Sequence, residues 1–511
     1  MARTRPRPRP VATGCLMGRL RGNPWAILCV LSLAYFMAQL DISVLTVAVP
    51  DITRDLHTSF DRVAWALGSY VLALAVTLIT AGRLGDLYGR RRVFRAGVVL
   101  FTLSSLVAGL TTTVDQLIAA RALQGLGAAL LIPQTMALLV EAFPVARRGT
   151  ALGVRGTVGA AAAVVGPLVS GLLVTVLDWR WVFFVNVPVG TALLLATVLV
   201  PDDDRAPGPA RLDVVGTLLV SVSLFCFAFA VSQGERYGWR GWFWGLVALS
   251  AVAFAVFLRQ QRRRQSGDPL VPFELFRDRD YALMNVVSVC VSLAFMGLVL
   301  VLSVFFQSVL AFSALKAGLA IVPAALCSMV FGTVAGRLSD RLPAKYLLLA
   351  GTGLTVAGML WTAAGMHEGA DWPRFVAPLS VIGVGNAFLF TPLAAVGLRG
   401  LRPELAGAAS GVLVTTLQIG SMIGTALSGA LLGGGAGSGP TAASSRSAMV
   451  LFAVVAALAA PACAASSRTP RAGGTGDRAP DEDAGRAAAG RSPCREPRPS
   501  GPGRGQGGVP R

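Results

Sequence analysis

Fourteen apolar runs, most of them about 20 residues long, constrain the fold of this 511-residue chain more than any other feature. A helix of about 20 mostly apolar residues crosses the roughly 30 Å hydrocarbon layer of a bilayer. Only 14% of the residues are charged, against roughly a quarter in a soluble protein. The sequence therefore predicts an all-α membrane protein with fourteen transmembrane helices, near residues 25–49, 63–81, 93–111, 116–140, 149–175, 180–200, 213–232, 241–259, 281–308, 315–335, 344–364, 374–396, 407–431 and 446–464.

The charge of the chain is strongly positive, with 45 Lys and Arg residues against 26 Asp and Glu residues. This balance could indicate a nucleic-acid partner, but the arginines fall in the gaps between apolar runs and in the tails, where membrane topology places them. The seven cysteines form no CxxC pair, and the sequence contains no nucleotide-binding loop or metal-ligand spacing. We therefore expect no nucleic-acid partner, no metal, no cofactor and no enzymatic activity.

A degenerate repeat relates the two halves of the chain. Residues 82–97 and 336–351 both begin with Gly-Arg-Leu-x-Asp and end with Ala-Gly, and each lies in a short charged gap between two apolar runs. Repeats of this kind indicate a duplicated membrane bundle, which is usually a transporter. Basic residues are concentrated in the even-numbered gaps, so the positive-inside rule places both copies and both termini in the cytoplasm.

The positions of the two copies also predict the domain organisation. The first copy follows span two and the second follows span ten, so spans seven and eight are expected to be an insertion between two six-helix bundles. The tails lack apolar periodicity and are predicted to be disordered. The expected parts are a basic cytoplasmic N-terminus at 1–24, a first bundle at 25–200, two inserted helices at 201–259, a cytoplasmic linker at 260–280, a second bundle at 281–465 and a cytoplasmic tail at 466–511.

The repeated loop resembles the signature between spans two and three of the major facilitator superfamily. Further segments resemble, in the right order, motifs of its fourteen-span drug:proton antiporters: Leu40–Pro50, Arg121–Gly127 with Pro133, Gly166–Pro167 with Ser170–Gly171, Trp179–Gly190, and Phe305–Gln307 with Ala317–Gly318. The resemblance implies the major-facilitator fold, with two six-helix bundles and two extra central helices, in a multi-pass plasma-membrane protein. Departures from the motifs at Thr46, Arg155, Ser170 and Leu417 concern substrate and coupling rather than fold.

Asp41 is the strongest candidate for a chemical role, because a charge in mid-bilayer costs about 3 kcal/mol on insertion scales. Asp41 and Arg121 reach similar depths from opposite sides of the membrane, and spans one and four are neighbours in the superfamily this chain resembles. Burial favours the neutral acid, whereas a nearby Arg favours the carboxylate, and this opposition suits a reversible proton-coupling site. The alternative is a static ion pair that only joins two helices.

The first copy of the repeat is interpreted as a conformational latch. Asp86 can accept hydrogen bonds from a helix N-terminus, and Arg90 and Arg91 can reach acidic groups such as Glu141. The resemblance implies that this set holds the two bundles together in the outward-facing state. The alternative is that these residues only anchor the loop on the positive side of the membrane.

The glycines of the loop and the second copy of the repeat belong to the same interpretation. Gly82 and Gly89 permit close helix approach and a tight turn. In the second copy Asp340 and Arg341 remain, but a Pro-Ala pair replaces the following Gly-Arg. We therefore expect a weaker latch there.

The fifth span contains the segment that resembles the antiporter motif. Gly166, Pro167 and Gly171 lie in a run of small residues, which predicts a bent helix that a neighbour can approach closely. By resemblance, the bend discourages leakage through the closed cavity, and the alternative is packing alone. Arg155 lies about one turn inside the cytoplasmic end of this span, so it is expected to extend toward the membrane surface, with contact to an anionic substrate as the weaker alternative.

Buried amides and aromatic residues supply the candidates for a substrate cavity. Gln124 is three residues after Arg121 and shares its helix face. The other amides within spans, Asn186 among them, are expected mainly to join helices. Phe residues could stack on a flat apolar substrate, although core or lipid-facing Phe is the commoner case. The cavity candidates are Gln124, Gln307, Phe36, Phe295 and Phe390.

Taken together, these features predict a secondary active transporter that exports amphipathic organic compounds, such as drugs or antibiotics, by proton antiport with alternating access. Its expected partners are the small-molecule substrate, protons and the lipid bilayer. The oligomeric state is left open, with a monomer as the default expectation. Two alternatives remain: a proton-coupled uptake permease on the same fold, and a non-transporting membrane sensor module.

Overall fold

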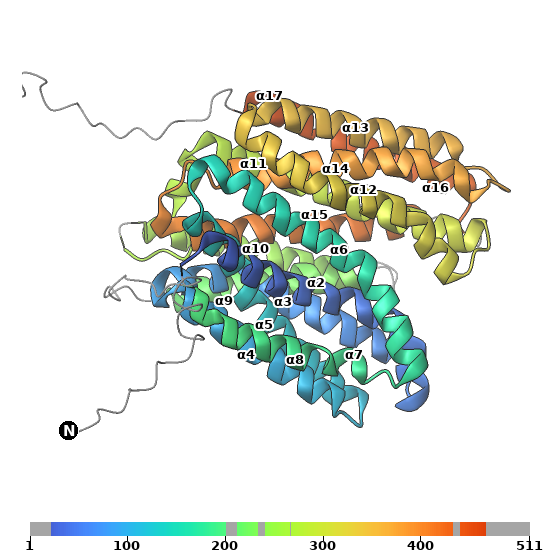
Figure 1. Cartoon of the computed structure of the whole chain (residues 1–511), viewed down its shortest axis with the longest axis horizontal. Coiled ribbons are helices and arrows are strands. Elements are labelled where there is room, and N and C mark those ends of the chain that lie inside the picture. The colour runs from blue at the N-terminus through green and yellow to red at the C-terminus, as the bar shows by residue number, and fades with distance from the viewer. Residues whose placement is uncertain (1–21, 201–211, 234–240, 266, 433–439, 467–511) are drawn as a thin grey trace, which may run out of the picture. The chain divides into compact units, whose positions relative to one another are not determined.

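The computed structural model describes residues 22–200, 212–233, 241–265, 267–432 and 440–466, and the tails predicted to be disordered lie almost wholly outside these residues. The described chain is helical throughout (Figure 1). Its α-helices are α2 (Pro24–Asp55), α3 (Phe60–Tyr88), α4 (Arg90–Gly109), α5 (Val114–Ala142), α6 (Arg148–Val176), α7 (Trp181–Phe184), α8 (Asn186–Ala196), α9 (Val214–Gln233), α10 (Gly241–Arg263), α11 (Arg279–Val304), α12 (Ala314–Arg341), α13 (Ala344–Gly365), α14 (Val376–Gly397), α15 (Ala406–Leu432), α16 (Ala442–Ala457) and α17 (Ala459–Ala465).

Short 3-10 and π segments join or extend these helices. They are η1 (Val145–Arg147), η2 (Thr197–Leu199), η3 (Phe273–Arg277), the π-turn η4 (Phe305–Val309), η5 (Trp372–Phe375) and η6 (Pro403–Leu405). Within the described residues, fourteen segments are long and apolar enough to cross a membrane, which confirms the predicted number of spans. The main differences are that the first helix continues to Asp55 and that the sixth span is divided between α7 and α8.

Side-chain caps mark several helix starts that hydropathy alone left vague. The side chains of Asn23, Thr113, Asp278 and Ser313 each accept a hydrogen bond from a backbone N–H in the first turn of the following helix. Between α3 and α4 the chain turns at Gly89, whose φ of 95° is a conformation that favours glycine. The predicted turn at this position is therefore present, and it separates two long helices with a single residue.

The two halves of the chain repeat the same packing scheme. In the first half α2 packs on α6, while α5 packs on both α3 and α4. In the second half α11 packs on α15, while α14 packs on both α12 and α13. The helices thus correspond in order, α2 to α11 and so on to α6 and α15. This correspondence gives two bundles of six spans each, α2–α8 and α11–α17 (Figure 1). In each bundle the last span contains two helices, α7 with α8 and α16 with α17.

The contacts between the bundles obey the same correspondence. α3 of the first bundle packs on α15 of the second, and α12 of the second packs on α6 of the first. Each of these two interfaces is the counterpart of the other. Both lie near the end of the bundles that carries residues 82–97 and 336–351, which we call the repeat end.

The inserted helices α9 and α10 pack mainly against each other, and α9 also contacts α3 and α15. Asp213, just before α9, is 1% exposed and joins the two helices. It accepts hydrogen bonds from Gly216 N at 3.0 Å, Gln260 Nε2 at 2.9 Å and Gln261 Nε2 at 2.6 Å, and it pairs with Arg264 Nη1 at 3.1 Å. This carboxylate therefore caps α9 and holds the end of α10.

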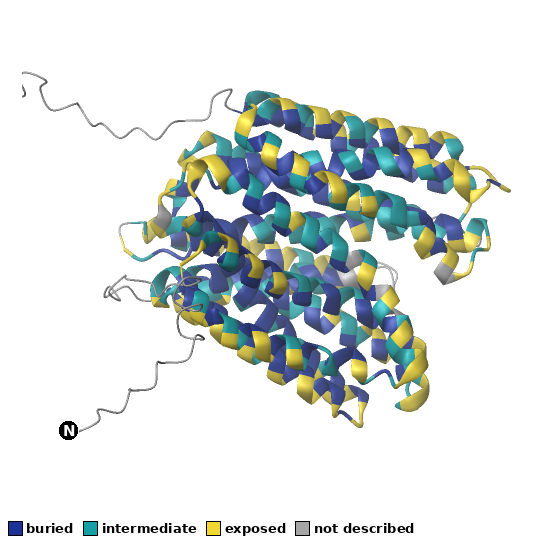
Figure 2. Cartoon of the chain, in the orientation of Figure 1, coloured by how far each residue is buried: buried dark blue, intermediate teal, exposed yellow. Residues whose placement is uncertain are grey.

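The outer surface of the described helices is rich in large apolar side chains, as expected where lipid replaces water (Figure 2). Leu103, Leu195, Leu218, Trp244 and Leu458 are each more than half exposed. Buried positions instead follow the inward faces of the helices (Figure 2). A polar group on these inward faces has no water to bind and must find a partner in the protein, which directs attention to the buried charges.

Candidate functional site

Asp41 of α2 meets three polar side chains from two other helices of the first bundle. Its Oδ2 forms an ion pair with Arg121 Nη1 of α5 at 2.5 Å. Its Oδ1 accepts hydrogen bonds from Gln124 Nε2 at 2.8 Å and from Asn186 Nδ2 of α8 at 2.9 Å. Gln124 Oε1 also accepts from Arg121 Nη1 at 2.7 Å. We call this connected set of Asp41, Arg121, Gln124 and Asn186 the Asp41 network.

The Asp41 network is fully enclosed, since none of its four members is more than 2% exposed. Aromatic rings cover the cation: the guanidinium carbon of Arg121 lies 4.4 Å from the Tyr70 ring centre and 5.8 Å from that of Phe183. Arg121 Nε is buried and has no hydrogen-bond partner. The cation is thus held by one carboxylate, the amide oxygen of Gln124 and two ring faces, and loss of the carboxylate would remove its only negatively charged partner among the described residues.

A glycine on α5 sets the distance between the Tyr70 helix and the Arg121 helix. A Cβ added at Gly125 would lie 2.3 Å from the carbonyl oxygen of Tyr70, so only glycine allows α3 to come this close. The short separation puts the Tyr70 ring over the guanidinium of the preceding turn. The hydroxyl of Tyr70 donates to the carbonyl oxygen of Ala38 on α2 at 3.4 Å, which fixes the ring orientation.

The first copy of the repeat joins the two bundles through Asp86. Its two carboxylate oxygens accept hydrogen bonds from Gly407 N at 2.9 Å and Ala408 N at 2.7 Å, at the N-terminus of α15. Arg90 pairs with Asp86 at 2.8 Å and with Glu141 of α5 at 3.0 Å. A carboxylate at a helix N-terminus satisfies backbone donors and opposes the helix dipole. We call this contact the Asp86 clamp.

The second copy forms the equivalent contact, which we call the Asp340 clamp. Asp340 accepts hydrogen bonds from Gly149 N and Thr150 N, each at 2.8 Å, at the N-terminus of α6, and from the hydroxyl of Thr150 at 2.5 Å. Arg341 is exposed, and among the described residues it pairs with no carboxylate. Each clamp therefore has two backbone N–H donors from the opposite helix, and among the described residues only Asp86 also has an arginine partner. The expectation of a weaker second latch stays a prediction.

Glycines bring the helices together beside each clamp. A Cβ at Gly82 would lie 2.4 Å from the carbonyl oxygen of Gly407, and one at Gly336 would lie 2.5 Å from that of Gly149. Each aspartate follows its glycine by four residues, or about one helical turn. The repeat therefore supplies both a close crossing and a charge that binds the N-terminus of the opposite helix.

The remaining latch residue, Arg91, points to a different part of the first bundle. Its Nε donates to the carbonyl oxygen of Thr197 in η2 at 3.0 Å, and the residue is 6% exposed. In the second bundle Arg399 Nη2 donates to the carbonyl oxygen of Ser339 at 3.2 Å. Together with the two clamps and the pair between Arg90 and Glu141, these contacts surround the repeat end and place both repeat copies at the same end of the bundles.

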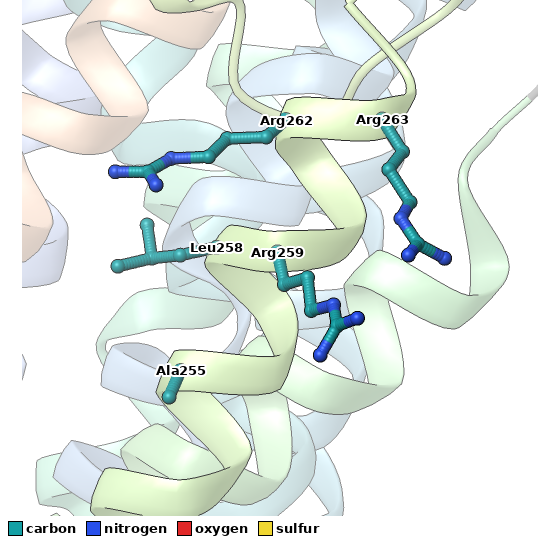
Figure 3. A pocket seen from close by; sticks show the side chains of 5 residues that line it. All are labelled: Ala255, Leu258, Arg259, Arg262 and Arg263. Carbon is teal, nitrogen blue, oxygen red and sulfur yellow. The ribbon is translucent and has the colours of Figure 1, made fainter.

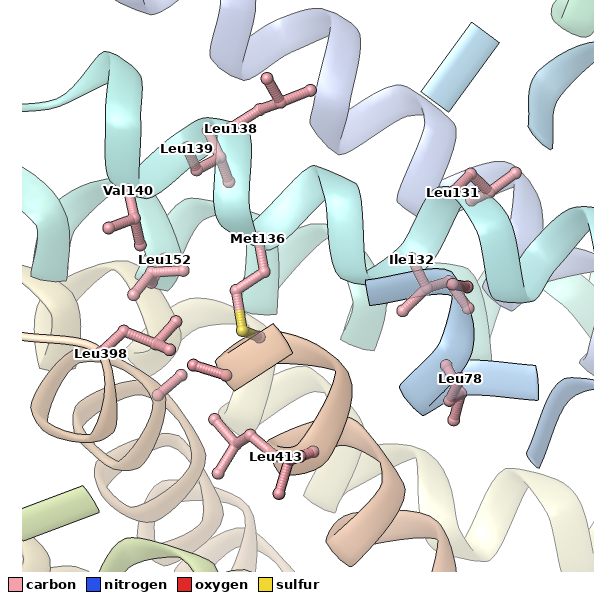
Figure 4. Close-up of a cluster of buried hydrophobic side chains, with 14 of the residues drawn as sticks. Leu78, Leu131, Ile132, Met136, Leu138, Leu139, Val140, Leu152, Leu398 and Leu413 are labelled. Carbon is pink, nitrogen blue, oxygen red and sulfur yellow. The ribbon is translucent and has the colours of Figure 1, made fainter. Parts of the chain in front are cut away.

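Apolar packing fills the repeat end between the clamps. Met136 of α5 extends toward α15, which carries Leu413 (Figure 4). Leu152 of α6 and Leu398, just after α14, belong to the same buried cluster. Since residues of both bundles contribute, this cluster closes the repeat end in the conformation described.

The segment of α6 that resembles the antiporter motif packs against α2. A Cβ at Gly166 would lie 1.9 Å from Ser43 Oγ, so this glycine permits close contact with α2 two residues beyond Asp41. A Cβ at Gly171 would meet nothing within 4 Å. The side chain of Pro167 lies outside the described residues. The structure thus gives Gly166 a packing contact, and a role in preventing leakage stays a prediction.

The predicted cavity candidates are found in different places. Gln124 is part of the enclosed Asp41 network rather than of an open surface. Phe295 of α11 and Phe390 of α14 meet edge to face with ring centres 5.9 Å apart, while Phe36 packs partly buried against the first bundle. Gln307 lies in η4, is exposed and bonds to Ser303 one turn earlier.

Arg155 does not extend to the membrane surface, so this expectation was wrong. It is 7% exposed, its Nε donates to Thr135 Oγ1 at 3.2 Å, and its guanidinium carbon lies 3.6 Å from the ring centre of Tyr35. An aromatic face stabilises a buried cation and removes the need to reach water. The sequence alone does not show that Tyr35, 120 residues earlier, lies against Arg155.

Several other residues of these sites were missed or underrated from the sequence. Asn186 was expected mainly to join helices, yet it donates directly to the Asp41 carboxylate. Its signal was a lone amide in an otherwise apolar span. Tyr70, Gly407 and Thr150 were not singled out, because nothing in their local sequence shows which charge they contact.

A shallow hollow on α10 is lined by Ala255, Leu258, Arg259, Arg262 and Arg263 (Figure 3). Basic residues in the last turn of a membrane helix are typical anchors at the bilayer surface. Among the described residues, His, Cys, Asp and Glu side chains form no group of three or more that could hold a metal ion.

Comparison with known proteins agrees with this architecture. The family model of the Major Facilitator Superfamily matches residues 31–234 and 215–425. An uncharacterized transporter of this type from Mycobacterium tuberculosis is 36% identical over 405 residues, which are 79% of this chain and 69% of the relative. The tetracenomycin C resistance and export protein of Streptomyces glaucescens is 34% identical over 416 residues, 81% of this chain and 77% of the relative.

A solved structure shows the same fold at much lower sequence identity. The crystal structure of the human organic anion transporter MFSD10 superposes with a TM-score of 0.63 at 14% identity, covering 86% of this chain and 99% of that one. At this identity the likeness concerns the fold alone. The family match, the relatives and the paired six-helix bundles together show that the chain is a transporter of the major facilitator superfamily.

Proposed function

We propose that this transporter exports amphipathic organic compounds in exchange for protons. The observation that carries the proposal is the enclosed ion pair of Asp41 and Arg121, which lies inside membrane-spanning helices and has no other charged partner among the described residues. An ionisable pair at this depth is costly to maintain and is a functional site by default. The export direction and the class of compound are supported by relatives whose names describe antibiotic export and multidrug resistance.

Proton coupling would use the balance of forces on Asp41. In the conformation described, Arg121 and two amide donors stabilise the carboxylate. Protonation would remove the charge that neutralises Arg121 and would weaken the contacts joining α2, α5 and α8. Binding or release of one proton would thereby change the relative free energies of two arrangements of the first bundle.

The two clamps and the apolar cluster are proposed to form the gate of an alternating-access cycle. With the repeat end facing the cytoplasm, the conformation described is closed on the cytoplasmic side and corresponds to the outward-facing part of the cycle. We also infer from the basic loops that the protein lies in the plasma membrane with both termini cytoplasmic, and that it acts as a monomer. We propose that the first bundle (25–200), the inserted helices (201–259) and the second bundle (281–465) are the parts that move relative to one another.

The test is transport into everted membrane vesicles containing the full chain. When the vesicle lumen is more acidic than the medium, vesicles with the wild-type protein should accumulate tetracenomycin C or other amphipathic antibiotics. Asp41→Asn should reduce this accumulation to the level of vesicles without the protein. Asp41→Asn keeps the size of the side chain, but it replaces one acceptor oxygen by an NH2 donor and cannot carry a titrating proton.

The matched control is Asp51→Asn on the same helix, where the carboxylate is only paired with Arg54 near the surface. This control should transport normally. Unimpaired proton-driven transport by Asp41→Asn would remove Asp41 from the mechanism, and proton-driven release rather than accumulation would indicate an uptake permease.

A further inference from the structure

Arg155 is a buried cation to which the mechanism above gives no role. We propose that Arg155, Tyr35 and Thr135 form a subsite that binds the carboxylate of an acidic amphipathic compound. The claim that this compound is the transported substrate rests on the proposed export function. The claim that these three residues bind a carboxylate rests on their geometry alone.

The first observation is that Arg155 pairs with no carboxylate of the described residues. Two other enclosed arginines of the first bundle are matched to acids, since Arg90 pairs with Asp86 and Arg121 with Asp41. Arg155 is 7% exposed, yet among the described residues its contacts are the Thr135 hydroxyl and the Tyr35 ring, and neither is a carboxylate. A buried charge without a partner is costly, which is the condition that an anionic ligand would relieve.

The second observation is the geometry of the guanidinium group. One face is stacked on Tyr35, and Nε is used by Thr135. The two terminal nitrogens of Arg155 make no hydrogen bond to the described chain and are not among its fully enclosed unpaired atoms, so each keeps some accessible surface. A planar pair of N–H donors matches the two oxygens of a carboxylate.

Glycines on α6 create the space for this arrangement. A Cβ at Gly159, one turn after Arg155, would lie 2.6 Å from Tyr35 Cε1, so glycine lets the ring lie against the helix. A Cβ at Gly156 would lie 3.5 Å from Thr391 Oγ1 of α14. The subsite therefore borders the second bundle, where relative movement of the bundles would change access to it.

The subsite is separate from the Asp41 network. Tyr35 precedes Asp41 by six residues on α2, a rise of about 9 Å. Arg155 lies seven residues beyond the start of α6, about 10 Å from the repeat end. A carboxylate bound by Arg155 would therefore not displace Arg121 from Asp41. Proton and anion would occupy different positions along the first bundle.

The experiment measures binding directly, without transport. Dissociation constants for 2-naphthoate and decanoate, and for their methyl esters, are obtained with the purified full-length protein from the shift of its thermal midpoint. The wild type should prefer each acid to its ester. Arg155→Gln should weaken binding of the acids about tenfold or more, as loss of a charge-assisted hydrogen bond would do, and leave the esters unchanged.

Three further variants define the cause. Arg155→Lys keeps the charge without the planar fork and should retain part of the preference, whereas Tyr35→Leu removes the ring but keeps Arg155 and should weaken the acids alone. Arg147→Gln removes an exposed positive charge from the same end of α6 and is the matched control, with no effect expected. Tyr35→Leu keeps the proposal testable if Arg155→Gln does not fold.

Each outcome has a defined meaning. The proposal is overturned if the wild type shows no preference for the acids, if Arg155→Gln and Tyr35→Leu bind them normally, or if acids and esters weaken equally. It is also overturned if inorganic phosphate at the same concentration gives an equal shift, because the site would then not require an amphipathic ligand. If the wild-type protein binds the acids in preference to the esters but drives no proton-dependent accumulation in vesicles, the export function is contradicted and the binding site is not.

Discussion

Asp41 receives three hydrogen bonds on two carboxylate oxygens, from one cation and two amides. This arrangement explains how a single acidic side chain can be enclosed within membrane helices, because every donor is supplied by the protein. It also makes the contribution of Asn186 understandable. An amide from the sixth span adds a neutral donor where a second cation would leave an excess of charge.

Asp213 provides a pH-dependent prediction at the residue scale, because the membrane-spanning segment found in the structure begins one residue later, at Val214. Burial raises the pKa of Asp213, but hydrogen bonds from Gly216, Gln260 and Gln261 and the charge of Arg264 outweigh burial and hold the pKa below its usual range. A carboxyl group with a lowered pKa stabilises the folded state above its unfolded pKa of about 4 and loses this contribution as the pH falls through the folded pKa.

Asp213→Asn should therefore lower the thermal midpoint of the purified protein at neutral pH. The loss should correspond to about 1.5–3 kcal/mol, the value of a hydrogen bond to a charged group. The difference between variant and wild type should stay constant from pH 7 to about 5 and shrink below about pH 4. Thermal unfolding measured across this pH range checks the result, and a difference that grows on acidification would contradict it.

At the scale of elements, the α3–α15 and α6–α12 crossings depend on glycine at the point of closest approach. The atoms that a side chain would meet are backbone atoms of the opposite helix, which cannot rotate away. Closure of the repeat end therefore requires glycine at these positions, whereas the clamps add a directional contact between an aspartate and a helix N-terminus.

Gly82→Leu is expected to oppose closure of the repeat end. Overpacking of about 1–3 kcal/mol would shift the ratio of closed to open forms by about 5-fold to 150-fold. Opening can be measured as the rate at which a permeant maleimide labels Ser410→Cys, a buried position on α15, in a background without other cysteines. Gly353→Leu on α13 is the control, because a Cβ there meets nothing within 4 Å. Equal labelling rates in both variants would exclude this role for Gly82.

At the scale of the whole molecule, the two bundles exchange equivalent contacts. α3 binds the N-terminus of α15 through Asp86, and its counterpart α12 binds the N-terminus of α6, the counterpart of α15, through Asp340. Two equivalent contacts on the same end resist separation of the bundles at that end while leaving the opposite end free to change. A rocking movement is therefore the simplest large motion that this pairing allows.

The orientation of the repeat end can be tested with single cysteines. Arg147→Cys and Arg341→Cys, both exposed at the repeat end, should resist a membrane-impermeant thiol reagent in intact cells and react after lysis. Glu368→Cys, in the loop after α13, should react in intact cells. Labelling of Arg147→Cys and Arg341→Cys from opposite sides of the membrane would be incompatible with the fold described.

The sequence was sufficient for those properties that depend on short segments. Run length and composition predicted fourteen helices because the bilayer requires about 20 apolar residues per span, whatever the neighbouring helices are. The repeat at 82–97 and 336–351 predicted two related bundles, and depth counted along each helix predicted that Asp41 and Arg121 could meet. Each of these inferences needs only local sequence and a fixed rise per residue.

Only the tertiary structure decided which partner each buried polar group binds. Asn186 reaches Asp41 across 145 residues, Asp340 finds the N-terminus of α6 across 190, and Arg155 rests on a ring that lies 120 positions away. Hydrogen bonds and ion pairs act over a few ångströms, so their partners are set by helix packing rather than by spacing along the chain. For this reason the sequence-based prediction placed Arg155 at the membrane surface. Its local sequence suited that position, but its neighbours in space hold it in the interior.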